Sequence, residues 1–138
     1  MIISNKKRRI LYMSKLYNGT KHDYSILKNE FPPSKDWFSN QKLLIDLGFQ
    51  GFVDDYTCQD VKIPIKKKRV KKGQENELST EQKLYNKNLG ADRVVIEHSI
   101  GGMKRYRILV NTIRLKLNTN IIDDLLVTCA GLWNYSMS

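Results

Sequence analysis

Leu43-Leu-Ile-Asp-Leu-Gly-Phe-Gln-Gly51 is the stretch of sequence that decides the fold class. Its first five residues are apolar except for Asp46, and glycines follow at positions 48 and 51. A short apolar run that stops at two closely spaced glycines predicts a buried β-strand that runs into a turn. Asp46 then stands at the strand end, where a carboxylate either caps the turn or serves as a site residue, since sites in α/β proteins collect at strand ends.

Predicted strands and helices lie on both sides of this stretch, in the order strand, helix, strand, strand, long helix, helix. Alternating apolar residues that end at turn residues indicate strands, and apolar residues three or four apart that stop at proline or glycine indicate helices. The predicted strands are residues 10–17, 43–47 and 61–65. The predicted helices are residues 22–31, a long helix that Ser79 or Thr80 caps and that runs past Tyr106, either continuous or broken near Leu89-Gly90, and residues 121–133. This mixture predicts an α/β protein.

Composition sets broad limits on the kind of protein. The 138 residues leave room for one domain with a modest core. No stretch approaches the roughly 18 consecutive apolar residues of a membrane span, and the N-terminal sequence does not resemble a signal peptide, so we expect a cytoplasmic protein with no membrane partner. Its two cysteines, Cys58 and Cys129, lack the spacing of metal ligands and are expected to be ordinary buried or half-buried thiols.

The chain is strongly basic. An excess of 24 Lys and Arg over 14 Asp and Glu gives a net charge of +10, which favours a polyanionic partner, nucleic acid first. Residues 1–9 are expected to form a basic arm ahead of a domain at residues 10–138. The predicted loop at residues 66–72 is either solvated or in contact with the DNA backbone, which would make binding steeply salt-dependent. Its cations are Lys66, Lys67, Lys68, Arg69, Lys71 and Lys72.

The long predicted helix carries three charged residues on one narrow face. At 3.6 residues per turn, Glu97 and Lys104 project about 40° and 20° away from Arg93. The arrangement is either an ordinary Arg–Glu pair on a helix surface or part of a site. Gly101 and Gly102 follow in the same helix, where each costs about 1 kcal/mol relative to alanine. They predict a kink, or the close approach of another backbone or of a nucleic-acid strand.

Five segments, taken in order, resemble the DDE-type insertion-sequence transposases. The segment that begins at Asp46 resembles the Asp-x-Gly-(Tyr/Phe)-x-Gly signature around the second catalytic acid of that family. The spacing Arg93-x3-Glu97-x6-Lys104 resembles the signature that contains the third acid. Gly19-Thr-Lys-His22-Asp23 resembles the segment before the second acid, and two further segments resemble the family sequence on the C-terminal side of the third acid. These are Lys104-Arg-Tyr-Arg-Ile-Leu109 and Cys129-Ala-Gly-Leu-Trp-Asn134.

The resemblance implies a fold, a chemistry and roles for named residues. It implies an RNase H-like mixed sheet and the cleavage and transfer of DNA strands with two divalent ions, Mg²⁺ or Mn²⁺. Asp46 and Glu97 would be the catalytic acids and metal ligands. Arg93 and Lys104 would hold DNA phosphate, and double-stranded DNA, as transposon ends and target, would be the partner.

Two departures from the family pattern define the alternatives. Gly90 stands where the second signature has tyrosine, and residues 1–9 hold no acid that could be the first catalytic Asp. Asp23 matches the His-Asp segment, but it is the first residue to test as a substitute. We therefore expect a C-terminal portion of a transposase that depends on an N-terminal half or a full-length relative for activity. The alternative is a non-catalytic, basic DNA-binding remnant.

Overall fold

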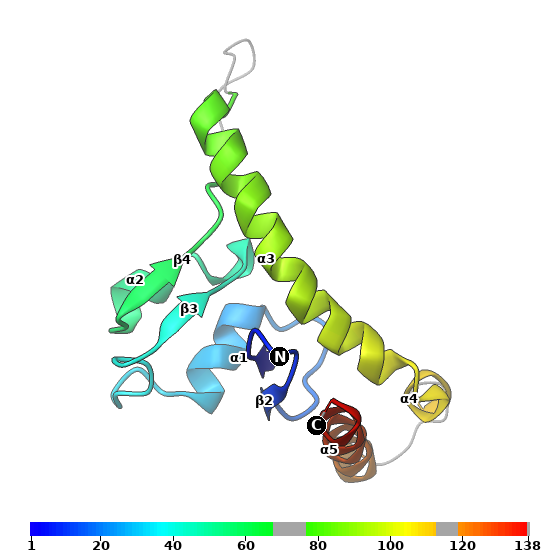
Figure 1. Cartoon of the computed structure of the whole chain (residues 1–138). Coiled ribbons are helices and arrows are strands. Elements are labelled where there is room, and N and C mark those ends of the chain that lie inside the picture. Colours follow the sequence, from blue (N-terminus) through cyan, green and yellow to red (C-terminus); the bar gives the residue numbers. More distant parts are fainter. Residues whose placement is uncertain (68–76, 113–118, 138) are drawn as a thin grey trace. The chain divides into compact units, whose positions relative to one another are not determined.

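The computed structural model describes residues 1–67, 77–112 and 119–137 (Figure 1). The chain divides into two compact units, which we describe separately: unit 1 comprises Met1–Lys21 and Val94–Ser138, and unit 2 comprises His22–Arg93. Both units contain strands and helices, which confirms the predicted α/β character. In the described part of the chain the strands form two separate two-stranded sheets.

Unit 2 is built around a parallel strand pair and a cluster of aromatic rings. Its elements are α1 (Asp23–Glu30), β3 (Lys42–Leu44), the 3₁₀ turn η1 (Leu47–Phe49), α2 (Phe52–Asp55), β4 (Asp60–Lys62) and the first part of α3 (Thr80–Lys104). β3 and β4 pair in parallel, with Leu43 opposite Val61. Phe38, Phe52 and Tyr56 are buried, and the rings of Phe52 and Tyr56 stack with centroids 4.8 Å apart. Phe52 and Tyr56 belong to the segment that connects the two strands, and both rings contact Phe38, which precedes β3.

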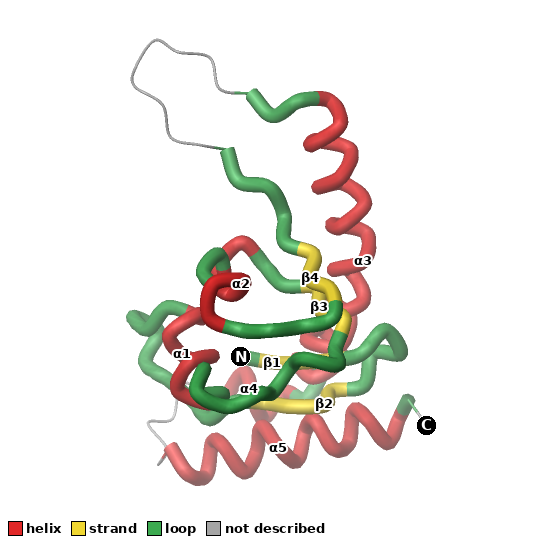
Figure 2. Tube along the Cα trace, turned by 90° about the vertical axis from the view of Figure 1, so that its left-hand side faces the viewer, coloured by secondary structure: helices red, strands yellow, loops and turns green. Residues whose placement is uncertain are grey.

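Unit 1 packs an antiparallel hairpin against the C-terminal helix. Its elements are β1 (Ile2–Ser4), β2 (Ile10–Met13), the last part of α3, α4 (Arg107–Thr112) and α5 (Thr119–Ser136). Figure 2 shows β1 and β2 side by side, with α5 along β2. The side chain of Asn134 in α5 accepts a hydrogen bond from the Ile10 amide and donates one to the Ile10 carbonyl, both at 2.8 Å. Asn134 therefore bonds the backbone of β2 much as a neighbouring strand would.

The packing around Gly102 explains why this position in α3 is a glycine. A Cβ atom built on Gly102 would lie 2.1 Å from Cζ3 of Trp133, so only a glycine leaves room for this ring in the core of unit 1. α3 continues through both glycines to Lys104. The group that approaches this helix at Gly102 is an indole side chain, so Gly102 is accounted for without the predicted kink and without a second backbone or a nucleic-acid strand.

The observed elements differ from the predicted ones mainly at their ends. Residues 1–9, expected as a basic arm, contain β1 and its turn into β2, so this segment folds with unit 1. The predicted strand at residues 10–17 ends at Met13. The long helix stops at Lys104, before Tyr106, and a separate α4 follows. These differences are local and leave the order of the predicted elements unchanged.

The start of α3 is fixed by Ser79. The Ser79 hydroxyl accepts a hydrogen bond from the Gln82 amide at 3.2 Å, and the Gln82 side chain accepts one from the Ser79 amide at 3.0 Å. This reciprocal arrangement is a capping box, which satisfies two amides that the first turn of a helix would leave unbonded. The sequence left Ser79 and Thr80 as alternatives, and the structure identifies Ser79 as the cap.

Candidate functional site

Asp46 lies at the start of the glycine turn that follows β3. It is the N-cap residue of η1, and its Oδ1 accepts a hydrogen bond from the Leu47 amide at 2.6 Å. The capping role that the sequence offered as one interpretation of Asp46 is therefore confirmed. The side chain is 50% exposed, so the carboxylate stays accessible beside the turn it caps.

Arg93 is the second site residue that unit 2 brings to this turn. Its Nη2 donates to Oδ2 of Asp46 at 3.2 Å, and its Nη1 lies 3.1 Å from Oδ1. A planar guanidinium matches a carboxylate in this two-point geometry. The two signature segments, separated by 47 positions in the sequence, thus meet through their charged side chains.

Tyr24 holds the other end of the glycine turn. Its hydroxyl oxygen lies 2.6 Å from the Gly51 carbonyl oxygen, and its single proton is shared between this carbonyl and the Asp55 carboxylate. A Cβ atom on Gly51 would lie 2.9 Å from the Tyr24 ring. The absence of a side chain at Gly51 therefore leaves space for the Tyr24 ring, whose hydroxyl in turn hydrogen-bonds the Gly51 carbonyl. The Oδ2 atom of Asp23 lies 3.9 Å from the Cβ position of Gly48, so α1 also reaches the middle of the turn. Tyr24 was not among the sequence-predicted site residues, because only its contact with Gly51 gives it a role.

A small polar network supports Tyr24. The Tyr24 hydroxyl is hydrogen-bonded to the Asp55 carboxylate, which also pairs with Lys28. Burial, and then the hydrogen bond with Asp55, raise the pKa of Tyr24 above its ordinary value. The hydrogen bonds from Lys28 and then Tyr24 lower the pKa of Asp55. At neutral pH the network therefore holds a neutral tyrosine and an ionised aspartate.

Glu97 and Lys104 lie on α3, as the sequence predicted, and both side chains are exposed. They belong to the part of the helix that folds with unit 1, whereas Asp46 and Arg93 belong to unit 2. The approach of the Glu97 carboxylate to that of Asp46, which the family resemblance implies, stays a prediction.

The predicted DNA-binding loop is only partly described. Lys66 and Lys67 are exposed, in agreement with either interpretation of this loop. Lys68, Arg69, Lys71 and Lys72 lie outside the described residues. The cysteines agree with the sequence analysis, because Cys58 is half-buried, Cys129 is buried and both are free thiols.

The described residues do not fit a metal ion as they stand. Both carboxylate oxygens of Asp46 face the Arg93 guanidinium, and one of them also accepts the Leu47 amide. A positive group in this position competes with a cation. Within the described ranges, no three His, Cys, Asp or Glu side chains gather in a way that would hold a metal. The site is, in this arrangement, an ion pair on a capped turn.

Comparison with known proteins gives two matches. Residues 1–134 match the family model described as DDE superfamily endonuclease. The chain is also 29% identical, over 143 residues, to the probable transposase for insertion sequence element IS702 of Microchaete diplosiphon. That alignment covers 100% of this chain and 45% of the relative, so the chain spans less than half of that protein's length. No solved structure matches the chain. In its described parts, no helix is both long and apolar enough for a membrane span.

Proposed function

The chain belongs to the DDE superfamily endonuclease family, and from this premise we propose that it supplies part of the catalytic domain of an insertion-sequence transposase. Such a domain would cleave phosphodiester bonds and join the freed DNA ends to a target duplex. The observation that carries the proposal is the contact between Asp46 and Arg93. It brings together two segments that were assigned to the family site independently, each from its own sequence pattern.

In this proposal each site residue has a separate task. Asp46 and Glu97 are the acids of the reaction centre. Arg93 and Lys104 are phosphate-binding groups, because guanidinium and ammonium groups bind phosphate oxygens strongly. The cations of residues 66–72 contact the DNA backbone without reading its sequence. The Asp46 carboxylate becomes available for catalysis only after the Arg93 guanidinium has moved from it to a phosphate of the DNA.

The divalent ions and the RNase H-like sheet belong to the assembled domain in this proposal. Mg²⁺ prefers oxygen ligands, and the chemistry of the family asks for more carboxylate oxygens than Asp46 and Glu97 provide. We expect the further acid to come from polypeptide beyond these 138 residues, either an N-terminal half or a full-length relative. The same polypeptide would add strands to the short sheets described above.

A DNA-binding role without catalysis is the second candidate. It is favoured if Arg93 stays on Asp46 when DNA is bound, because a carboxylate paired with a guanidinium is not free to bind a metal ion. In that case the chain would bind DNA through its basic residues and compete with an active relative for the same DNA.

A plasmid-nicking assay separates the two candidates. The purified chain, with Mg²⁺ or Mn²⁺, should leave supercoiled DNA intact. Fusion to the part of an insertion-sequence transposase that this chain does not match should produce nicks, and Glu97→Gln should abolish them without loss of DNA binding. Glu81→Gln is a matched control, because Glu81 is an exposed glutamate in the first turn of the same helix.

The outcomes are distinct. Nicking by the fusion that survives both Glu97→Gln and Asp46→Asn would overturn the assignment of the two acids. DNA binding by a fusion that never nicks would support the non-catalytic role. Nicking by the chain alone, dependent on Glu97, would place the further acid within these residues, with Asp23 the first to test.

A further inference from the structure

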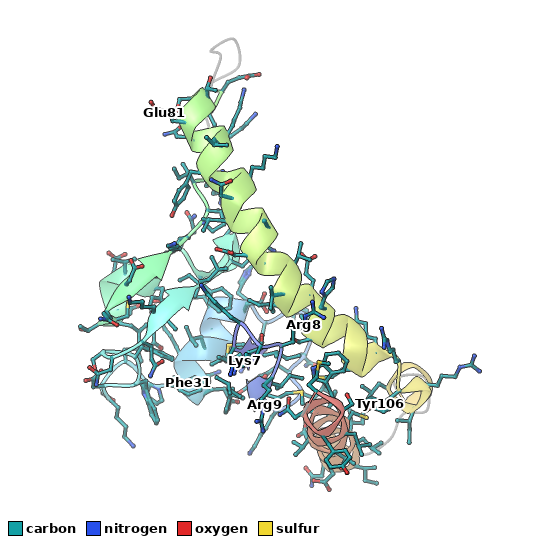
Figure 3. The ribbon with its side chains drawn as sticks, viewed as in Figure 1. Lys7, Arg8, Arg9, Phe31, Glu81 and Tyr106 are labelled. Carbon is teal, nitrogen blue, oxygen red and sulfur yellow. The ribbon has the colours of Figure 1, made fainter. Side chains whose placement is uncertain are left out.

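Residues 6–9, which we call the basic turn, connect β1 to β2 in unit 1. All four residues, Lys6, Lys7, Arg8 and Arg9, are cationic, and all four are exposed. Lys7, Arg8 and Arg9 are labelled in Figure 3. Among the residues that the structure describes, none of these four side chains forms an ion pair with a carboxylate. The basic turn therefore carries concentrated and uncompensated positive charge.

The backbone of the basic turn is held by Asn5. Oδ1 of Asn5 accepts hydrogen bonds from the amides of Lys7 and Arg9, at 3.0 and 3.1 Å. The Asn5 amide donates to the Arg9 carbonyl, and the Arg8 amide donates to the Asn5 carbonyl, both at 3.0 Å. One asparagine thus organises the whole turn, and the four side chains start from fixed positions.

Arg8 is anchored a second time from beneath the turn. Its carbonyl accepts hydrogen bonds from Nε1 of Trp133 at 2.8 Å and from Oγ of Ser99 at 3.0 Å. Ser99 is completely buried, and the Trp133 ring is fixed against Gly102. The basic turn is therefore attached to both α3 and α5 through one carbonyl group.

Arg8 also adopts an unfavourable backbone conformation. Its φ angle is 63°, in the left-handed region that glycine enters without strain and that a branched or long side chain enters at a cost. Arg8 is the only non-glycine residue with a positive φ in the described part of the chain. Strained residues of this kind concentrate at functional sites. Glycine would adopt this conformation without strain, so what the arginine adds at this position is its charged side chain.

We propose that the basic turn is a preorganised binding site for the phosphate backbone of duplex DNA, separate from the loop at residues 66–72. The inference rests on the DNA-directed function proposed above. Four adjacent cations repel one another, and a ligand with closely spaced negative charges relieves that repulsion. Duplex DNA offers one charge per 1.7 Å or so of helix axis. Because the turn is already ordered, little conformational freedom is lost on binding.

Salt dependence of DNA binding tests the proposal. Affinity of the full chain for a short labelled duplex is measured at several salt concentrations, for the wild type and for a variant with Lys6, Lys7, Arg8 and Arg9 all replaced by glutamine. Each phosphate contact contributes about 0.9 to the slope of log affinity against log salt, so the slope should fall by roughly 2–4. Circular dichroism checks that the variant is folded.

A charge-matched control removes four cations elsewhere. Lys15, Lys42, Lys62 and Lys87 are exposed, and none pairs with a carboxylate within the described residues. Their replacement by glutamine changes the net charge equally and should lower the slope by less than about 1. Equal effects of the two variants would overturn the proposal, because they would mean that overall charge alone drives binding.

Footprinting of the wild-type chain gives a test that needs no variant. Bound DNA should protect Lys6 and Lys7, but not Lys15 and Lys42, from an amine-acylating reagent, as read by mass spectrometry. Equal modification of all four lysines in the complex would overturn the proposal. Both tests measure binding alone, so an inactive fusion in the nicking assay leaves them unaffected. A wild-type chain that fails to bind duplex DNA would overturn this inference together with the proposed DNA-directed function.

Discussion

Arg93 closes the carboxylate of Asp46 from one side, with Nη2 donating to Oδ2 at 3.2 Å and Nη1 lying 3.1 Å from Oδ1. The two side chains are 36% and 50% exposed. Ion pairs this accessible to water are worth about 0–1 kcal/mol. The pair can therefore be opened at little cost, which the proposed change of Asp46 from ion-pair partner to catalytic acid requires.

Removal of Arg93 should make Asp46 more available to cations. We expect Arg93→Gln to strengthen Mn²⁺ binding near Asp46 by up to about fivefold, the equivalent of about 1 kcal/mol for an exposed ion pair. Paramagnetic broadening of the Leu47 and Gly48 amide signals during a Mn²⁺ titration reports binding at this turn. Lys87→Gln removes one exposed charge from the same helix and serves as the control. Indistinguishable titrations for the two variants would mean that Arg93 does not compete with a cation at Asp46.

The two neighbouring glycines of α3 should respond to alanine in opposite directions. Gly102→Ala places a methyl group 2.1 Å from a Trp133 ring that is hydrogen-bonded to Arg8, and such overpacking costs about 1–3 kcal/mol or more. Gly101→Ala meets nothing within 4 Å and should stabilise the helix by up to about 1 kcal/mol. Urea unfolding of the two variants measures the free energies. A stable Gly102→Ala protein would show that α5 can move away from α3.

The network at Asp55 predicts a loss of stability in acid. The pKa of Asp55 is lower in the folded chain than its ordinary value of 3.8, because Lys28 and Tyr24 hydrogen-bond its ionised form. This contribution to the free energy of unfolding is complete above the ordinary value and is lost as the pH falls through the lowered pKa. Lys28→Met should return the pKa of Asp55 toward 3.8, as followed by NMR titration of its carboxyl carbon. Lys42→Met is the control variant, and it should leave the titration curve of Asp55 unchanged.

The capping box predicts a difference between two adjacent hydroxyl residues. Ser79→Ala removes the acceptor of the Gln82 amide and should destabilise the start of α3 by about 0.5–2 kcal/mol. Hydrogen exchange of the Gln82 amide should accelerate accordingly. Thr80→Ala, one residue later and also solvent-accessible, should change this exchange rate little. Faster exchange in the Thr80 variant alone would contradict the assignment of Ser79 as the cap.

The sequence by itself determined the elements whose hydrogen bonds are local. Residues a few positions apart predicted α1, α5 and the glycine turn that follows Asp46. They also offered the cap at Asp46, and a cap at Ser79 or Thr80, among the alternatives. A helix bonds each amide to a carbonyl four residues earlier, so its spacing and its end signals are contained in one short window of sequence.

Only the tertiary structure decided the contacts between distant residues. The bonds from Ser99 and Trp133 to Arg8 span 91 and 125 positions, and no local pattern near Arg8 announces either partner. β1 was missed for the same reason, because a strand is stabilised by bonds to its neighbour and not to itself. The packing of the Trp133 indole against Gly102 and the pairing of Arg93 with Asp46 are also contacts between distant segments. They depend on which surfaces meet when the chain folds. Periodicity can identify the residues that need a partner, but packing in three dimensions chooses which partner they receive.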